Sequence, residues 1–238
     1  MKIIFTMAGE YTRFADFSSE IPKYLLPTKN GLILDDVIKP YSKSTIFSEV
    51  IFVCNENDKK FIHIVEERLN YFRKAKTSLI YINQTSSQVE TALEAINIKN
   101  LNNSNSKIII SNIDTILLNR NFESMSKELD NCDGALDTFE AYDKDYSYIM
   151  PNEENEIVNI KEKIQISDIA ASGLYGFNSV KKFVENAGVH RKKIKNFSEL
   201  YQIMINNGKK IKMIHSQSSN NTIVVGTPNQ YLDFISSK

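Results

Sequence analysis

The sequence contains few of the residues that mark several protein classes. Only two cysteines occur among its 238 residues, Cys54 and Cys132, far apart and in neither metal-ligand spacing nor a Cys-x-x-Cys motif. This pattern argues against a zinc site and is typical of a reducing compartment. We expect both thiols to lie in the core or half-buried.

The chain also has no excess of charge and no long apolar run. Lys plus Arg and Asp plus Glu each number 29, which predicts no nucleic-acid partner, no membrane partner and only a local anion site. A signal peptide and a membrane span are both absent from the pattern, because Lys2 precedes only a short apolar run. We therefore expect a cytoplasmic protein.

Short β-branched runs alternate with helical spacing in the first part of the chain. We predict strands at Ile3 to Thr6, Val50 to Cys54, Ser78 to Ile82 and Lys107 to Ser111. The clearest helical pattern spans Glu56 to Ala75. This alternation predicts an α/β fold whose mixed, mostly parallel central sheet has helices on both faces.

After about residue 130 the pattern becomes rich in strands. We expect strands at Gly134 to Glu140, Tyr146 to Met150, Ile157 to Glu162, Gly173 to Phe177, Ile211 to His215 and Thr222 to Val225. The polar turn at residues 151–155 indicates a hairpin, and helices are expected at Asn178 to Ala187, at Phe197 to Asn207 and from Pro228. We predict one domain over residues 1–238, in which the pattern changes at about residue 130.

The loop after the first strand is where an open α/β sheet would bind a ligand. Gly9 would let backbone N–H groups approach a phosphate, and Thr12, Arg13 and Lys23 add a hydroxyl and two cations. A surface loop with two solvated cations would look the same. The absence of G-x-G-x-x-G disfavours a dehydrogenase.

A carboxylate follows another predicted central strand. Asp114, with Asn112 two residues earlier, would lie at the same edge of the sheet as the first loop. A lone carboxylate suits Mg²⁺ that is shared with substrate phosphates, and it equally suits a helix N-cap. The sequence at this strand end has no D-x-D motif, which disfavours a glycosyltransferase.

An ordered set of segments resembles the sugar-phosphate nucleotidyltransferases, with their A-G-x-G-[ST]-R, P-K-x-[LM], E-K, G-[IL]-Y-x-F and V-G-T-P elements. The matching segments are Met7 to Phe14, Pro22 to Pro27, Gln84 to Thr91, Ser111 to Asp114, Ile160 to Lys163, Ser172 to Phe177 and Val225 to Pro228. The resemblance implies a GT-A-like fold, with a nucleotide-binding half to about residue 130 and a β-rich acceptor-binding half at 131–238. It also implies attack by a phosphomonoester on the α-phosphorus of a nucleoside triphosphate, with release of pyrophosphate.

The resemblance also implies roles for individual residues. Arg13, Lys23 and Asp114 would be catalytic, and Asp114 would hold Mg²⁺. The nucleotide would contact Ala8, Gly9, Glu10, Tyr11, Thr12, Gln84, Ser87, Gln88 and Asn112. The acceptor would contact Glu162, Lys163 and Gly173.

Simpler roles stay open for some of these residues. Gln88 could cap a helix, and Glu162 with Lys163 could form a solvated ion pair. Gly173 could kink a strand or let the acceptor approach the backbone. The basic run Arg191 to Lys195 is more typical of a solvated loop.

Three positions depart from the family pattern. Tyr11 replaces the second glycine of the first loop, Ser87 stands where glycine is frequent, and Val224 replaces a second carboxylate for the metal. We expect a nucleotidyltransferase that couples an NTP to a sugar phosphate or another small phosphomonoester in capsule or surface-glycan biosynthesis. The alternative is a catalytically weakened or inactive nucleotide-binding or partner-binding module.

Overall fold

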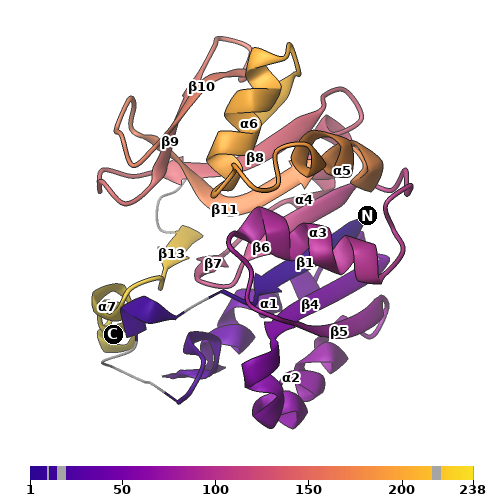
Figure 1. Ribbon diagram of the computed structural model, residues 1–238. Helices are drawn as coiled ribbons and strands as arrows, with labels where there is room; N and C mark the ends of the chain where they lie inside the picture. The colour runs from indigo at the N-terminus through magenta and orange to yellow at the C-terminus, as the bar shows by residue number, and fades with distance from the viewer. Residues whose placement is uncertain (10, 15–19, 216–220, 238) are drawn as a thin grey trace.

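The computed structural model describes residues 1–9, 11–14, 20–215 and 221–237, and its centre is a nine-stranded sheet (Figure 1). Its strands are β1 (Lys2–Met7), β4 (Glu49–Asn55), β5 (Lys76–Ile82), β6 (Ile108–Asn112), β8 (Gly134–Glu140), β9 (Ser147–Pro151), β10 (Ile157–Glu162), β11 (Ile169–Phe177) and β12 (Ile211–His215). The order is β10-β9-β11-β6-β1-β4-β5, and β8 pairs with both β11 and β12. The predicted mixed α/β fold is confirmed.

The parallel part of the sheet consists of β6, β1, β4 and β5. Strand β1 pairs in parallel with β4 and β6, and its residues from Ile3 to Met7 are buried. Such continuous apolar runs are expected where helices cover both faces of a parallel sheet. Thr6 lies opposite Asn112, so the carboxyl ends of β1 and β6 meet at one edge. Beyond β6 the pairing of β11 with β6, β8 and β9 is antiparallel.

Helices cover both faces of the sheet (Figure 1). They are α1 (Ile33–Ser42), α2 (Ile62–Leu69), α3 (Gln88–Ile98), α4 (Phe122–Glu128), α5 (Val180–Gly188), α6 (Phe197–Asn206) and α7 (Pro228–Ser236). Ile3 and Phe5 of β1 belong to one core cluster, with buried residues of α1, α2 and α4. Ile4 belongs to the other cluster, with α3, α5 and α6. Successive side chains of β1 therefore point alternately into the two core clusters.

Two sequence-based element predictions needed adjustment. The helix expected over Glu56 to Ala75 is α only from Ile62 to Leu69, and 3₁₀ turns flank it on both sides. Asn55 starts this segment by accepting a hydrogen bond from the backbone N–H of Asn57 at 3.0 Å. Helix α1, which contains Pro40 in its last turns, was not among the elements assigned a range from the sequence. The expected hairpin is confirmed as antiparallel β9 and β10.

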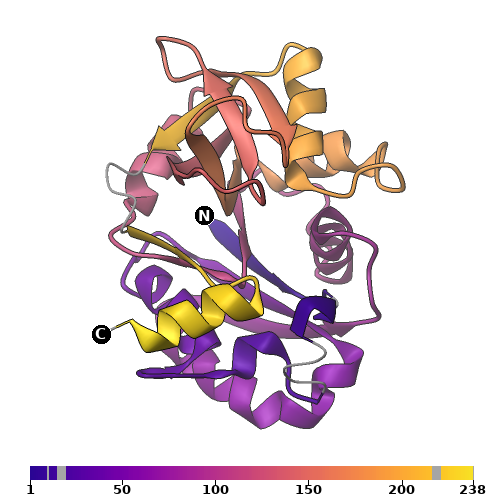
Figure 2. The ribbon, with the colours of Figure 1, turned by 90° about the vertical axis from the view of Figure 1, so that its left-hand side faces the viewer.

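The end of the chain packs against its beginning. Strand β13 (Thr222–Val224) pairs antiparallel with β7 (Thr115–Leu117), and α7 lies beside the N-terminal elements (Figure 2). The Tyr231 hydroxyl of α7 donates to the Pro27 carbonyl at 2.7 Å. This places the turn at residues 225–228 next to the carboxyl edge of β1 and β6. None of the helices in the described part of the chain is both long and apolar enough to span a membrane.

A bulge in β11 requires a glycine at the edge of the future site. The register of β11 against β8 shifts between Ala171 and Tyr175, and Gly173 has a φ of 93°. A Cβ at Gly173 would lie 2.8 Å from Nδ2 of Asn112. Of the two roles left open for Gly173, the strand kink is therefore present in the structure.

We predict that Gly173→Ala lowers the free energy of unfolding by about 1–3 kcal/mol, because it adds both backbone strain and a clash with Asn112. Urea denaturation followed by circular dichroism measures this loss. Gly188→Ala is the control, since a Cβ there meets no atom within 4 Å and its φ is not positive. Equal midpoints for the two variants would contradict the prediction.

Candidate functional site

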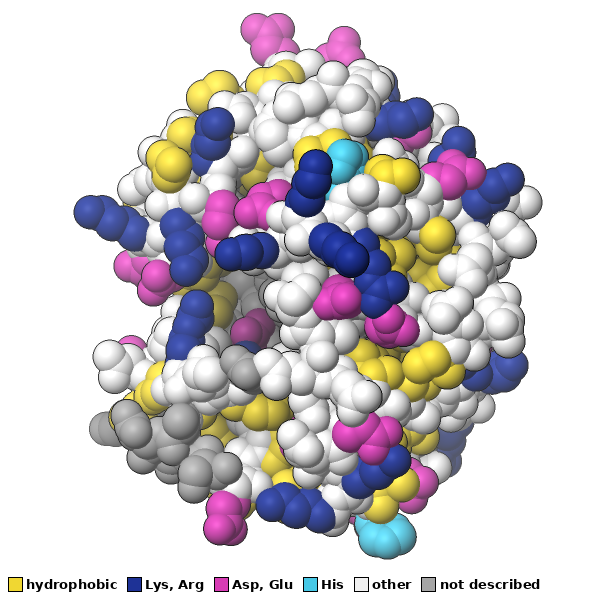
Figure 3. Space-filling model, in the orientation of Figure 1, with side chains coloured by type: hydrophobic (Ala, Val, Ile, Leu, Met, Phe, Trp, Pro, Cys, Tyr) yellow, Lys and Arg dark blue, Asp and Glu magenta, His cyan; other side chains and the backbone are white. Residues whose placement is uncertain are grey.

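A cleft of about 820 Å³ opens at the carboxyl edge of β1 and β6. Figure 3 shows a hollow in this face of the molecule, with Lys and Arg side chains along its rim. The cleft brings together most of the residues that the sequence singled out, namely Gly9, Tyr11, Thr12, Arg13, Lys23, Gln84, Ser87, Gln88, Asn112, Asp114, Glu162, Lys163 and Gly173. Ala8 is fully buried and is not among the lining residues. Glu10 lies outside the described residues.

Two short 3₁₀ turns present the cations of the first loop. Arg13 lies between Thr12 and Phe14, and the buried Phe14 ring fixes this turn to the core. Lys23 begins the second turn, which is anchored by the buried side chain of Tyr24. Gly9 faces open space, since a Cβ there would meet no atom within 4 Å. The loop therefore offers backbone and cationic groups to the cleft.

The strongest contact in the cleft joins the first loop to the end of β6. Lys23 Nζ lies 2.6 Å from Oδ2 of Asp114, and these side chains are only 14% and 24% exposed. Burial alone would raise the pKa of Asp114, but the positive charges of Lys23 and Arg13 outweigh burial and lower this pKa. Asp114 precedes β7 rather than a helix, so the alternative of a helix N-cap is wrong.

The turn at residues 225–228 closes over Asp114 from the other side. The Val225 N–H donates to the Asp114 carbonyl at 2.8 Å, and a Cβ at Gly226 would lie 3.3 Å from Oδ2 of Asp114. Val224 lines the cleft and lies opposite Thr115, the residue after Asp114. Val224 and Asp114 therefore line the same cleft and are offset by one residue along the paired strands.

The oxygen ligands at this edge fit a metal ion that is held mainly by substrate. Among the described residues no group of three or more His, Cys, Asp or Glu side chains could hold a metal alone. Asp114 supplies one carboxylate, and the buried Oδ1 of Asn112 has no hydrogen-bond partner within the described chain. Mg²⁺ needs only one or two protein carboxylates when phosphates complete its shell. These residues thus suit Mg²⁺ that arrives with a nucleotide.

Ser87, rather than Gln88, caps helix α3. The Ser87 Oγ accepts from the Glu90 N–H at 3.1 Å, and α3 begins at Gln88. The proposed capping role of Gln88 is therefore wrong, and its side chain lines the cleft. Thr85, in the loop before α3, is held to the helix by a hydrogen bond of 2.6 Å between its hydroxyl and that of Thr91.

Tyr11 lines the cleft, and its hydroxyl forms hydrogen bonds with other residues of the protein. Its hydroxyl lies within hydrogen-bond reach of the Met7 carbonyl and of Asp58, to which Tyr24 donates at 3.0 Å. The rings of Tyr11 and Tyr24 pack edge to face with centroids 5.8 Å apart. Burial is the main cause that raises the pKa of Asp58 and that of Tyr11. Tyr11 stands where the family pattern has its second glycine, and these contacts hold its ring in the wall of the cleft.

The opposite wall comes from the β9–β10 hairpin and the segment before α6. Glu162 accepts from the hydroxyls of Ser147 and Ser198, the latter at 2.8 Å. Among the described residues Glu162 forms no ion pair with Lys163, so the solvated pair suggested by the sequence is wrong. Lys163 adopts a φ of 55° and is exposed at the cleft.

Sequence reasoning missed two members of the basic run after α5. Lys195 lines the cleft, and Arg191 forms ion pairs with Glu90 and Glu94 of α3. The run Arg191 to Lys195 is therefore not merely a solvated loop. About a hundred residues separate Arg191 from its partners, so local spacing held no signal for the contact.

We predict that Asp114→Asn lowers the stability at pH 7 by about 1–3 kcal/mol, because Lys23 is left half-buried without its partner. Since folding lowers the pKa of Asp114, the carboxylate stabilises the protein fully above its unfolded pKa of about 3.9. This stabilisation is lost as the pH falls below that value toward the folded pKa. Urea midpoints of both proteins between pH 7 and pH 3 should converge.

Asp130→Asn serves as the control for this titration, because the Asp130 side chain is 63% exposed beside Lys107. It should shift the urea midpoint little at any pH. A gap between wild type and Asp114→Asn that stays constant down to pH 3 would contradict the expected charge coupling.

Comparisons with known proteins agree with this geometry. No curated protein matches the chain in sequence. A nucleoside-diphosphate-sugar pyrophosphorylase from Vibrio cholerae RC9 superposes with a TM-score of 0.86 at 22% identity, covering 99% of this chain and 100% of that one. A Bacillus anthracis protein, provisionally named a glucose-1-phosphate thymidylyltransferase and solved with a sucrose, has a TM-score of 0.78 at 12% identity, covering 98% and 93%.

The TM-scores show that these two proteins share the fold of this chain. The family model described as Nucleotidyl transferase matches residues 2–235 and thus nearly the whole chain. The segments that resemble the family motifs occur along the sequence in the family's order, which is consistent with that match. The chain belongs to the nucleotidyl transferase family.

Proposed function

We propose that the protein transfers a nucleotidyl group from a nucleoside triphosphate to a sugar phosphate or another small phosphomonoester and releases pyrophosphate. The observation that carries this proposal is the Lys23–Asp114 pair at 2.6 Å, in a cleft that is also lined by Arg13 and Lys163. The names of the two similar structures, a sugar pyrophosphorylase and a thymidylyltransferase, support the same reaction. From the resemblance we infer a role in capsule or surface-glycan biosynthesis.

The reaction joins two anions, so charge and orientation are what the protein must supply. Lys23 would contact the α-phosphate, and Arg13 would neutralise the departing pyrophosphate. Lys163, on the opposite wall, would hold the phosphate of the acceptor. The acceptor phosphate oxygen is the nucleophile, so no side chain needs to form a covalent intermediate.

An incoming triphosphate would compete with Asp114 for the Lys23 ammonium group. The pair therefore keeps the cation in place, and a half-buried carboxylate ionised, until the substrate arrives. Asp114 would then be available to hold Mg²⁺, which neutralises phosphate charge when bound. Asn112, whose buried Oδ1 lacks a partner among the described residues, also lines this cleft.

We predict that Lys23→Gln lowers pyrophosphate release by about 100- to 1000-fold, because a preorganised cation at the transferring phosphoryl group is lost. The assay combines each of ATP, CTP, GTP, UTP and dTTP with Mg²⁺ and a panel of phosphate esters, and measures pyrophosphate. Lys43→Gln is the control, since Lys43 is exposed and does not line the cleft.

Thermal unfolding of each variant keeps the result interpretable, because Lys23→Gln also breaks the pair with Asp114. Full turnover in a folded Lys23→Gln variant would overturn the assigned role. If the wild type binds nucleotide without regard to Mg²⁺ and releases no pyrophosphate with any pair, the non-catalytic module is the better description. The missing carboxylate at Val224 is the observation that favours this second candidate.

We predict that Val224→Asp lowers the Mg²⁺ concentration needed for half-maximal activity, because it adds a second carboxylate beside Asp114. The gain should be several-fold, and Val224→Asn provides a control of similar size without charge. A Mg²⁺ dependence that is the same in Val224→Asp and Val224→Asn would show that this position is not part of a metal site.

A further inference from the structure

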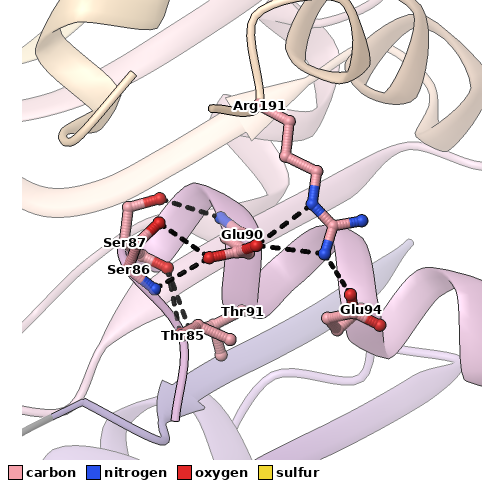
Figure 4. Close-up of polar contacts among 7 residues, drawn as sticks. All are labelled: Thr85, Ser86, Ser87, Glu90, Thr91, Glu94 and Arg191. Carbon is pink, nitrogen blue, oxygen red and sulfur yellow. Dashed lines mark hydrogen bonds and ion pairs between the residues drawn. The ribbon is translucent and has the colours of Figure 1, made fainter. Parts of the chain in front are cut away.

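Arg191 reaches from the loop after α5 onto the exposed face of α3 (Figure 4). Its Nε and Nη2 lie 3.2 and 3.1 Å from Oε1 of Glu90, and Nη2 also contacts Glu94. The Arg191 side chain is 40% exposed, whereas Glu90 is 22% and Glu94 30% exposed. Two nitrogens of one guanidinium thus bridge two carboxylates that lie one helical turn apart.

The same Glu90 carboxylate holds the loop that precedes α3. Its second oxygen, Oε2, accepts from the backbone N–H and from the hydroxyl of Ser86, both at 2.7 Å (Figure 4). The Glu90 N–H in turn donates to Ser87 Oγ at 3.1 Å. One carboxylate therefore joins Arg191 on one side to the loop at residues 84–88 on the other.

This loop and the segment that carries Arg191 line the same cleft from different sides. Gln84, Ser87 and Gln88 line it from the α3 side, and Lys195 lines it from the segment that leads into α6. The hydrogen bonds described above fix the loop, which contains no glycine or proline. The position of Arg191 is therefore linked through Glu90 to Ser86, which lies between Gln84 and Ser87, two residues proposed to contact nucleotide.

We propose that Arg191 is a positioning residue that holds the loop at residues 84–88 in its nucleotide-binding conformation through Glu90. This inference rests on the proposed function for the identity of the ligand. Arg191 itself does not line the cleft. A merely structural tie between α3 and the segment after α5 would stabilise both elements without a specific effect on Ser86.

Hydrogen exchange of the protein without nucleotide tests the positioning directly. In Arg191→Ala the amides between Ser86 and Glu90 should exchange about three- to tenfold faster, since the anchor of the Glu90 carboxylate is lost. Lys182→Ala is a matched control, because Lys182 is a cation of α5 with 48% exposure that pairs only with Glu185 among the described residues. Exchange that is unchanged at 86–90, or equally faster throughout α3 and α5, would overturn the inference.

Glu94→Gln and Glu90→Gln separate the two partners of Arg191. Glu94 contacts Arg191 but not Ser86, so Glu94→Gln should change exchange at Ser86 much less than Glu90→Gln. Similar effects of the two variants would mean that the loop does not depend on the Glu90 carboxylate.

Kinetics provide the second readout. Arg191→Ala should raise the KM for the nucleoside triphosphate about three- to tenfold and leave kcat within about twofold, because a ground-state loop is loosened while reacting groups stay in place. Arg191→Lys should restore part of the loss. An unchanged KM in Arg191→Ala would overturn the inference. If the wild type releases no pyrophosphate, the proposed function fails, and the exchange experiment alone then decides the role of Arg191.

Discussion

The site depends on the in-register parallel pairing of β1 with β6. Because Thr6 lies opposite Asn112, the first loop and the Asn112 to Asp114 segment leave the sheet at the same edge. The sheet is buried on both faces, so a slip of one residue would turn every side chain of a strand to the opposite core. The burial of these side chains therefore holds the register. The Lys23–Asp114 contact is a consequence of this register, although 91 residues separate the two in the chain.

A buried ion pair links three strands near this edge. Arg120 is 6% exposed and lies 2.8 Å from Asp137 of β8, which also accepts from the Ser172 hydroxyl of the β11 bulge at 2.6 Å. The same guanidinium contacts Thr222, at the start of the strand that carries Val224. Such a pair contributes little net stability, and a mispaired β13 would remove the hydrogen bonds from Arg120 to the Asn221 carbonyl and the Thr222 hydroxyl. Arg120 and Asp137 thus link β8 to the β11 bulge and to β13, and the last two of these line the cleft.

Local sequence patterns predicted strands at each position of the central sheet, and the family resemblance pointed to further residues that line the cleft. Ile3 to Thr6 and Lys107 to Ser111 are β-branched runs whose type depends on neighbours close in the chain, and Gly9, Arg13 and Asp114 follow their ends. Long-range partners were not predictable in this way. The guanidinium of Arg191 finds Glu90, and the hydroxyl of Tyr11 finds Asp58, only after the chain has folded. Helix α1 forms in spite of Pro40, because Val37, Ile38 and Tyr41 are buried and tertiary packing overrides a local helix breaker.

Two of the three departures from the family pattern, Tyr11 and Val224, have different physical weight. The Tyr11 hydroxyl bonds to groups of the protein, so the structure holds the ring that replaces the lost glycine. Val224 has no such compensation, because no other carboxylate pairs with β7 at that point in the described chain. The neighbouring charges that lower the pKa of Asp114 keep the remaining carboxylate ionised. A site with one ionised carboxylate and several cations can still bind a polyanion such as a nucleoside triphosphate, provided that the nucleotide supplies most ligands of its metal.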